Sequence, residues 1–496
     1  DPAYRVAYRG LVNGIVSLRW GVALVYVLLC GVGLWLIPPQ LGLEIFPVAS
    51  ARQIRLRVFA PTGTRIERTE PLALKALELI RETLGPEKVA LTTSFVGTHA
   101  SSYPVSLIHL FMTGPHEAVL TVSIQPAAKV NTASAQEAIR ARLAKDLPQL
   151  KVLFEGGDIV SQVMSLGSPT PIRVMVVGPS LPADYQFAEK IQVELKKLPF
   201  LRDLQIQQPN DYPTLEMQIN RDRAAQYGLT TMDVTRSLVA ATSSSRFIEP
   251  NYWRDPASGN AFQVQVELPP AKVKSGDDIA SISLSKAGNT QPLAGDLITM
   301  KNGKTMGLIE RFNGQKLISL AANLEGVTLG RALPEVEAAV LRAGEAPRGI
   351  KVQIGGQAGP LKETIEGLQT GLWIAGVSIF LLLAAAFQSF RLAFVVLLLS
   401  PAILSGSLLA LWFTGSTINI QSYLGSIMAL GIAIANAILY LSFAEAEGNV
   451  AAAGGARLRA ILMTAFAMIA GMLPMALGLG EGGEQTAPLG RAVIGG

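Results

Sequence analysis

Asn436 is a polar side chain in a stretch where polar side chains are costly. It lies in the apolar run Ser426–Ala446, where an unpaired amide at membrane depth would lose the hydrogen bonds that water provides. One interpretation is that this amide bonds a neighbouring helix, a contribution of about 1 kcal/mol. The other interpretation is a role in an ion pathway, because polar groups inside a membrane are often functional. The residues alone leave both interpretations open.

Possible metal ligands are gathered in the middle of the chain: His99, His109, His116, Met112, Met164 and Met175. Soft metal ions bind such side chains. The three histidines, however, have no spacing that one helix or turn would fix around a metal, and a methionine in a sheet core usually fills space. We therefore expect no metal site and no cofactor.

Neither nucleotide hydrolysis nor covalent catalysis has a recognisable motif in this sequence. Gly303-Lys304-Thr305 resembles the end of a phosphate-binding loop, but Ile298 stands where the first glycine of that motif is required. Asn302-Gly303 is typical of a hairpin turn instead. No serine, histidine and acid stand at a recognisable catalytic spacing. Energy for any transport would come from an ion gradient or from a partner.

The elements that would hold Asn436 are membrane helices. Between Gly367 and Gly480 the only charged residues are Arg391 and a cluster at 445–459, so uncharged runs could cross a membrane about four times. Within them Gly425, Ala429, Ala433 and Ala437 recur every fourth residue, which predicts a helix face that packs closely against another helix. Hydrophobic residues make up 49% of the chain and charged residues 16%, with a mean hydropathy of +0.36, which suits a mixed membrane and soluble protein.

Another apolar run near the N-terminus predicts a single span. Residues 20–43 carry no charge until Glu44, and Pro38-Pro39 should end the helix. Arginines flank the apolar runs on what would be the cytoplasmic side: Arg5, Arg9, Arg19, Arg391, Arg457 and Arg459. A cleaved signal peptide is the competing interpretation, because Ala49-Ser50-Ala51 could be a cleavage site, but the apolar run is too long and the site too distant. The single cysteine, Cys30, says nothing about the redox compartment.

The soluble region, residues 44–366, shows a strand and helix pattern that occurs twice. In residues 44–166 the order β-α-β-β-α-β is that of a ferredoxin-like unit, with strands at 53–59, 88–96, 118–124 and 151–154 and helices at 67–84 and 134–147. A second unit is divided between residues 167–209 and 307–366, with a hairpin at Asn313-Gly314. Residues 210–306 interrupt it, with strands at 214–219 and 260–268 and two short helices around Gly228. The fold class is therefore a multi-pass α-helical membrane protein with a large α+β region.

Three segments carry a family resemblance: GIAIANAIL at 431–439, RLRAILMT at 457–464 and APLGRAVIGG at 487–496. They resemble the C-terminal half of a resistance-nodulation-division (RND) efflux permease, and the likeness extends over nearly the whole chain. The segment 220–241 is also similar to a recurrent stretch of that family. The resemblance implies lead-in and first span at 1–43, a paired porter region interrupted by a docking-type insertion, a four-helix block at 367–480 and the start of a further span at 481–496. Since the chain opens with Asp1 and stops at Gly496, we interpret it as a fragment.

The resemblance also implies a proton relay. In RND pumps an arginine and a threonine seven residues later join a lysine on an earlier span and two aspartates in the other half; Arg457 and Thr464 occupy the first two positions here. Ala460 replaces the usual proline, and Ala435 replaces the lysine immediately before Asn436. Simpler roles exist: Arg457 could be a cytoplasmic anchor, and the hydroxyl of Thr464 could bond its own helix. With Ala435 in place of lysine, coupling through the usual set is in doubt.

The function implied by the resemblance is export across a bacterial inner membrane. The intact protein would be a homotrimer that moves small amphiphilic compounds with a periplasmic adaptor and an outer-membrane channel, without a nucleic-acid partner or enzymatic activity. The rival interpretation is a scaffold or assembly factor built on the same plan that exports nothing, and Ala435 favours it. The substrate cannot be inferred, because residues of the other half would share the cleft.

Overall fold

The computed structural model describes residues 3–47, 52–98, 110, 112–126, 128, 130–157, 168–269, 272–284, 291–480 and 482–496. His99, His109, Met164 and the stretch Ala49–Ala51 lie outside the described residues, as do the side chains of Arg5 and Arg9. The chain forms two compact units. One consists of Asp1–Gln208 with Ile309–Gly496, and the other is Pro209–Leu308.

The first soluble sheet consists of four antiparallel strands in the order β2-β3-β1-β4. Its elements are β1 (Gln53–Phe59), α3 (Ile66–Leu84), η1 (Pro86–Lys88), β2 (Val89–Val96), β3 (Glu117–Ile124), α5 (Thr132–Asp146) and β4 (Lys151–Glu155). Because side chains alternate along a strand, Ile54, Leu56 and Val58 enter one core with the buried faces of α3 and α5. Arg55 and Arg57 alternate with them and therefore lie on the opposite face.

The second sheet repeats this order. Its elements are β5 (Ile172–Val177), α7 (Leu181–Leu195), β6 (Leu201–Ile206), β11 (Glu310–Phe312), β12 (Gln315–Leu324), α12 (Leu329–Arg342) and β13 (Lys351–Gly356). Strand β12 pairs with β5 and β6, and β5 also pairs with β13. The hairpin predicted at Asn313-Gly314 is confirmed, because Phe312 pairs with Gln315 and both turn residues have positive φ, 49° and 78°.

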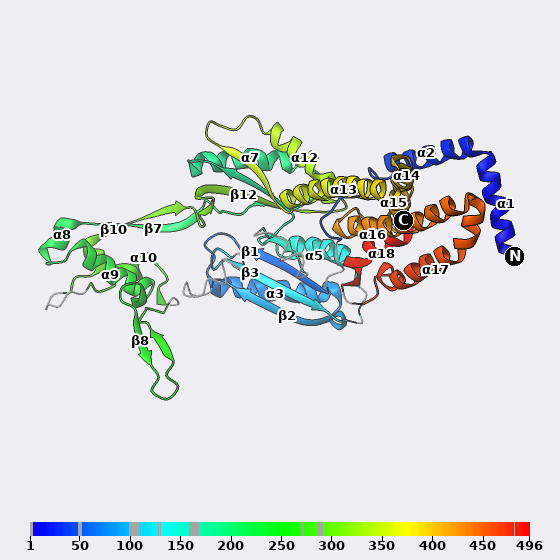
Figure 1. Cartoon of the computed structure of the whole chain (residues 1–496). Coiled ribbons are helices and arrows are strands. Elements are labelled where there is room, and N and C mark those ends of the chain that lie inside the picture. Colours follow the sequence, from blue (N-terminus) through cyan, green and yellow to red (C-terminus); the bar gives the residue numbers. More distant parts are fainter. Residues whose placement is uncertain are drawn as a thin grey trace. The chain divides into compact units, whose positions relative to one another are not determined.

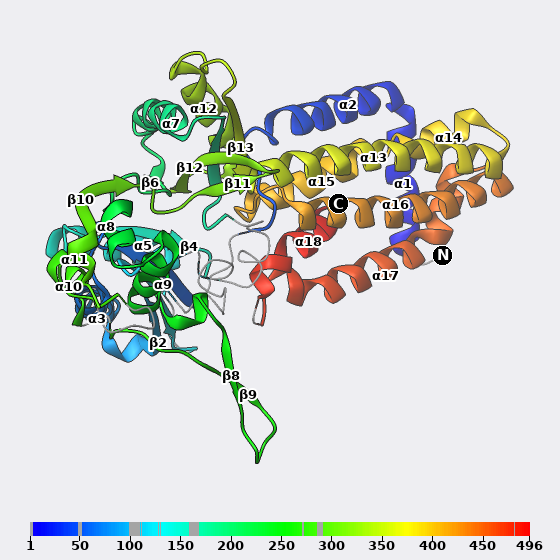
Figure 2. The ribbon, with the colours of Figure 1, turned by 90° about the vertical axis from the view of Figure 1, so that its left-hand side faces the viewer.

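The unit Pro209–Leu308 is built on a two-stranded ribbon. It contains β7 (Tyr212–Ile219), α8 (Arg221–Gln226), α9 (Thr231–Thr242), η2 (Ser245–Phe247), β8 (Asn251–Arg254), β9 (Ala261–Val264), α10 (Gly276–Ala280), α11 (Ala294–Leu297) and β10 (Ile298–Thr305). Its small core includes Ala224, Val234, Leu238 and Leu297. The hairpin β8–β9 extends away from the helices of this unit (Figures 1 and 2).

One local prediction in this unit is wrong. Asn302 and Gly303 form no hairpin turn; both lie inside β10, where they pair with Leu215 and Thr214 of β7. The reason is tertiary: β7 supplies a complete partner strand, and its pairing outweighs the turn preference of an Asn-Gly pair. Glu216 and Thr214 leave little room beside position 303, where a Cβ would lie 2.8 Å from Glu216 Oε1. Glycine fits there because it has no Cβ.

Among the described residues five segments are long and apolar enough to cross a membrane, one near the N-terminus and four within residues 358–476. The helices are α1 (Ala3–Ser17), α2 (Arg19–Leu36), α13 (Ala358–Phe387), α14 (Phe390–Leu397), α15 (Ser400–Phe413), α16 (Ile420–Glu447), α17 (Val450–Ala476) and α18 (Gly483–Gly495). Helices α14 and α15 together make one span, Phe390–Phe413, and α2 ends just before Pro38. These long helices gather in one bundle (Figures 1 and 2).

The small-residue face predicted on α16 is packed as expected. A Cβ on Gly425 would lie 2.4 Å from the carbonyl oxygen of Leu489 and 2.9 Å from Ala492 Cβ on α18, so the two backbones are in close contact. Ala429 is buried, and Ala433 and Ala437 pack against a cluster formed with α13, α14 and α15. Asn436 directly precedes Ala437 in the sequence, so it lies about 100° around the helix from this packed face.

Candidate functional site

Helices α16 and α17 carry all the residues predicted to act in transport, and a two-residue connection joins them. Gly448 ends α16 in the left-handed conformation, with φ 62°, which glycine adopts without strain. Asn449 then caps α17, its Oδ1 accepting hydrogen bonds from the backbone N–H groups of Ala451 and Ala452 at 3.0 and 3.1 Å. The tight turn makes the two helices antiparallel neighbours.

Arg457 is held against α16 by an aromatic ring. Its guanidinium carbon lies 3.9 Å from the centroid of the Phe443 ring, a short cation–π contact. Its Nε is buried and has no hydrogen-bond partner among the described residues. One turn earlier on α17, Gly454 accommodates the ring of Tyr8 from α1, because a Cβ there would lie 2.7 Å from that ring. Arg457 therefore has an ordered position that does not depend on a carboxylate.

Thr464 makes a local hydrogen bond. Its hydroxyl donates to the carbonyl oxygen of Ala460 on its own helix at 2.6 Å, the simpler role anticipated for this side chain. Thr464 follows Arg457 by seven residues, about 10.5 Å along a helix axis. No described contact joins these two residues.

Asn436 and Ala435 lie beside the packed face of α16. Asn436 is half-buried and Ala435 is exposed, and the amide of Asn436 makes no hydrogen bond with any residue that the structure describes. Most side chains of α17 beyond Arg459 are exposed as well. The described part of the chain thus brings Arg457 to Phe443. It leaves Thr464 exposed and Asn436 half-buried without a hydrogen bond to any described residue.

Arg491 is a polar residue of the bundle that sequence reasoning did not assign. On α18, its Nη1 donates to Ser416 Oγ at 2.6 Å and its Nε donates to the carbonyl oxygen of Ala476 at 2.9 Å. That carbonyl belongs to the last turn of α17, where a cation stabilises the negative end of the helix dipole. The available signal was a single charge in the apolar segment 487–496.

Glu44 is a second polar residue that sequence reasoning did not assign to a site, and no sequence signal distinguishes it. Its backbone N–H donates to the carbonyl oxygen of Ile418 at 3.0 Å, and Thr417 Oγ1 donates to its Oε2 at 3.1 Å. Burial raises the pKa of the Glu44 carboxyl, and the hydrogen bond from Thr417 only partly opposes this shift. The connection between α2 and β1 thus places a half-buried acid against the loop that precedes α16.

An ionic cluster occupies the face of the first sheet opposite α3 and α5. Glu155 Oε1 accepts a hydrogen bond from Arg57 Nη2 at 2.6 Å. Arg55 Nε forms an ion pair with Glu155 Oε2 at 2.8 Å, and Arg57 lies 4.0 Å from Glu117. Burial raises the pKa of the Glu117 carboxyl, although the positive charge of Arg57 and the hydrogen bonds from Thr113 act to lower it. His116 Nε2 lies 3.7 Å from Glu117 Oε1. Each carboxylate already has cationic or hydrogen-bonding neighbours.

Of the three methionines considered above as metal ligands, the two that the structure describes have packing roles. Met112 is fully buried with Leu110 and Val119, and Met175 packs with Val177 and Leu317. Across the described residues, no three His, Cys, Asp or Glu side chains are close enough to hold a metal ion together.

The bundle of candidate spans, with a duplicated α+β region between the first span and the rest, defines a polytopic membrane protein with a large soluble region. The chain belongs to the AcrB/AcrD/AcrF family, which it matches over residues 3–496. It is thus a chain of the RND permease family, located in the inner membrane with several candidate spans and a large periplasmic region.

Relatives with recorded names match part of the chain. The cobalt-zinc-cadmium resistance protein CzcA of Cupriavidus metallidurans is 29% identical over 347 residues, 66% of this chain and 32% of CzcA. The nickel and cobalt resistance protein CnrA of the same organism is 26% identical over 349 residues, 66% of this chain and 31% of CnrA. The toluene efflux pump membrane transporter TtgB of Pseudomonas putida is 29% identical over 301 residues, 58% of this chain and 27% of TtgB.

A crystal structure of a heavy metal efflux pump has the same fold, with a TM-score of 0.82 and 23% identity. The match covers 99% of this chain and 50% of the pump chain. The chain therefore spans about a third of the length of the named relatives and half of the solved pump.

Proposed function

We propose that this chain is the C-terminal half of an exporter subunit that an ion gradient drives. What supports the proposal is that the chain belongs to this family and has five candidate spans among the described residues. The three residues predicted to form the relay, Arg457, Thr464 and Asn436, occur on two neighbouring helices of this chain. Thr464 is exposed, and the half-buried amide of Asn436 has no hydrogen-bond partner among the described residues. Carboxylates from the other half of the pump would complete the relay there. The protein would be a secondary-active transporter rather than an enzyme.

The relay we propose lacks its usual cation. A lysine at position 435 would stand next to Asn436, but Ala435 carries no charge. We therefore assign the role of the cation to Arg457 rather than to the exposed Arg459, two residues later on α17. Phe443 orients the guanidinium of Arg457. The scaffold interpretation, in which nothing is exported, is less favoured because the family match spans the whole membrane block.

We propose that the periplasmic region consists of two ferredoxin-like porter subdomains and a docking-type insertion. Supporting this, both sheets have the same strand order, with β4-β1-β3-β2 matching β13-β5-β12-β6. The compact unit Pro209–Leu308 leaves and rejoins the second sheet between β6 and β11. The insertion would contact a periplasmic adaptor and an outer-membrane channel in a homotrimeric assembly.

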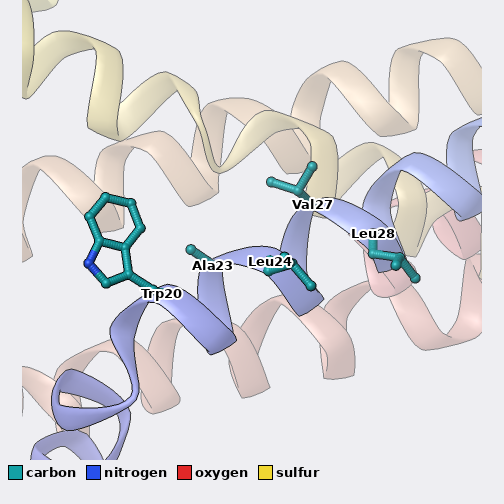
Figure 3. Close-up of a pocket in the computed structure, with 5 residues that line it drawn as sticks. All are labelled: Trp20, Ala23, Leu24, Val27 and Leu28. Carbon is teal, nitrogen blue, oxygen red and sulfur yellow. The ribbon is translucent and has the colours of Figure 1, made fainter.

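For the cargo we propose small amphiphilic compounds. An open, shallow apolar surface lies along α2 and is formed by exposed side chains of this one helix, namely Trp20, Ala23, Leu24, Val27 and Leu28 (Figure 3). Such an exposed apolar surface would face the acyl chains of a bilayer, from which an amphiphile would reach the protein. Divalent metal cations are the second candidate, because CzcA and CnrA are named for resistance to such ions.

Efflux measurements in cells that express the full-length gene test both cargoes. A fluorescent amphiphile and, separately, zinc and cobalt ions would be loaded, and their loss followed with and without an uncoupler. We expect uncoupler-sensitive loss of the amphiphile. Loss of metal alone would transfer the proposal to the second cargo, export that ignores the uncoupler would contradict an ion-driven mechanism, and absence of all export would favour the scaffold.

A further inference from the structure

Asp184 is a fully buried acid at the start of α7. Its side chain is 0% exposed, and neither Oδ1 nor Oδ2 has a hydrogen-bond partner among the described residues. Buried carboxylates normally pair with a cation or accept several hydrogen bonds, because an isolated buried charge is costly. Asp184 has neither kind of partner, and no step of the proposed export uses it.

The carboxyl of Asp184 occupies space that a glycine leaves open. Gly178 directly follows β5, and a Cβ there would lie 2.9 Å from Asp184 Cγ and 3.1 Å from Oδ2, with Oδ1 closer still. The backbone N–H of Asp184 donates to the carbonyl oxygen of Ser180 at 2.9 Å. The end of β5 and the first turn of α7 are thus fitted to each other through this one side chain.

The surroundings of the carboxyl are apolar. Helix α7 packs on β5, β6, β12 and α12 (Figure 1). The strand side chains on the same face as position 178 include Val174, Val176 and Leu320, all buried. The buried side chains of α12 are apolar as well. This environment offers a carboxylate no replacement for the water that it loses on burial.

The charged groups of the surrounding elements do not pair with this carboxyl. Lys316 on β12 is level with Gly178, because Leu317 pairs with Val177, but among the described contacts it makes no bond to Asp184. Arg173 on β5 bonds Glu310 and Asp203 on β6 bonds Arg140. The other charged residues of α7, of the end of α12 and of the connection into β13 are exposed or paired with each other: Glu189, Lys190, Glu194, Arg342, Glu345, Arg348 and Lys351.

Two effects act on the ionisation of Asp184 in opposite directions. The first turn of a helix favours a negative charge. Burial without a partner favours the neutral form, and it is the larger effect, because a helix terminus stabilises a charge by much less than its unpaired burial costs. Burial accordingly raises the pKa of the Asp184 carboxyl. The folded chain therefore keeps a proton at a pH where the unfolded chain has released it.

We propose that Asp184 and Gly178 form a pH-sensitive latch at the start of α7. The neutral carboxyl fits against Gly178 and holds the first turn of α7 on the end of β5. Once ionised, the carboxylate requires water or a cation, and the buried position supplies neither, so the first turn of α7 loosens. The latch is a property of the second soluble sheet and does not depend on the proposed cargo or on ion coupling.

The direction of the pH effect follows from the raised pKa. The stabilisation by the latch is fully present below the ordinary aspartate pKa of about 3.9, and it is lost as pH rises through the raised value. Asp184→Asn has nearly the same shape but cannot ionise, so the start of α7 should no longer respond to pH.

Hydrogen exchange of the full-length protein tests this expectation. Protection of the segment 181–188, corrected for the intrinsic pH dependence of exchange, should fall by roughly tenfold or more from pH 5 to pH 9 in the wild type. It should change far less in Asp184→Asn. Glu189→Gln, which removes an exposed acid of the same helix, is the matched control and should behave as the wild type does. A wild-type change no larger than that of Asp184→Asn would overturn the latch.

A second pair of variants tests the contact with Gly178 and does not rely on Asp184→Asn. Gly178→Ala places a methyl group where the carboxyl lies, so the segment 181–188 should lose protection already at pH 5. Gly178→Ala combined with Asp184→Ala removes the clash and should regain protection that no longer depends on pH. Full protection in Gly178→Ala alone, or a pH response that persists in the double variant, would refute the proposed contact.

Discussion

Arg457 on α17 is stacked on Phe443 of α16, with 3.9 Å between the guanidinium carbon and the centre of the ring. This contact fixes the one charged member of the predicted relay to the neighbouring helix, at a point two turns of α17 away from Thr464. An arginine that served only as a cytoplasmic anchor would need no such partner.

Replacing Phe443 should therefore loosen Arg457. Phe443→Leu keeps an apolar side chain but removes the ring, and it should cost about 0.5–2 kcal/mol, the range of a cation–π contact. Phe443→Trp is the matched control, because indole binds cations at least as well. Thermal unfolding of the purified protein measures both, and equal melting temperatures for the leucine and tryptophan variants would count against the contact.

Thr464→Ala should lower export strongly and stability little. The hydroxyl bonds only Ala460 of its own helix, so its loss should change the free energy of unfolding by about 1 kcal/mol or less. Efflux of the fluorescent amphiphile and the yield of assembled protein would be measured together. Thr464→Ser, which retains the hydroxyl, should keep most of the activity. Export that survives Thr464→Ala unchanged would end the relay proposal for this residue.

Glu44 should make the protein less stable at high pH. Its pKa is raised by burial, so its contribution to stability is fully present below the ordinary glutamate pKa of about 4.3 and is lost as pH rises through the raised value. Glu44→Gln cannot ionise and should remove this loss. The melting temperature of Glu44→Gln minus that of the wild type should therefore increase from pH 4 to pH 8.

Glu445→Gln, at an exposed position on α16, serves as the comparison for that measurement. A difference between wild type and Glu44→Gln that stays constant across the pH range would show that Glu44 does not titrate as described.

Removing residues 210–306 should leave a folded membrane protein. The ends of the insertion are already adjacent, since Gly307 N–H donates to the carbonyl oxygen of Pro209 at 2.8 Å. Gln208 is also anchored to the second sheet, where its Oε1 accepts from Ser319 N–H at 2.9 Å and its Nε2 donates to Glu310 Oε2 at 2.8 Å. A short turn from Pro209 to Gly307 should preserve the fold and the yield, but the adaptor should no longer co-purify. An unfolded product would contradict this division of roles.

The loop between α16 and α17 should be cytoplasmic and the insertion periplasmic. In a cysteine-free background, Asn210→Cys should react with an impermeant thiol reagent in cells whose inner membrane is intact, and Glu447→Cys should react only after that membrane is opened. Both positions are exposed. The reverse pattern of labelling would invert the topology.

The sequence alone determined the membrane spans and much of the secondary structure. A bilayer requires about 20 uncharged residues per helix, and alternation with period two marks a strand that is buried on one face; both are local properties. The strand Gln53–Phe59 and the long helix Ile420–Glu447 with its small-residue face form as expected for this reason.

The tertiary structure decided which polar groups meet. Asn302-Gly303 became part of a strand because β7 lies beside it, and Glu44 became a half-buried acid because Thr417, 373 residues away, packs against it. Arg457 is stacked on Phe443 rather than paired with a predicted relay member because the turn at Gly448 sets how the two helices face each other. Such contacts depend on the packing of segments distant in the chain, and spacing along the sequence contains no direct record of that packing.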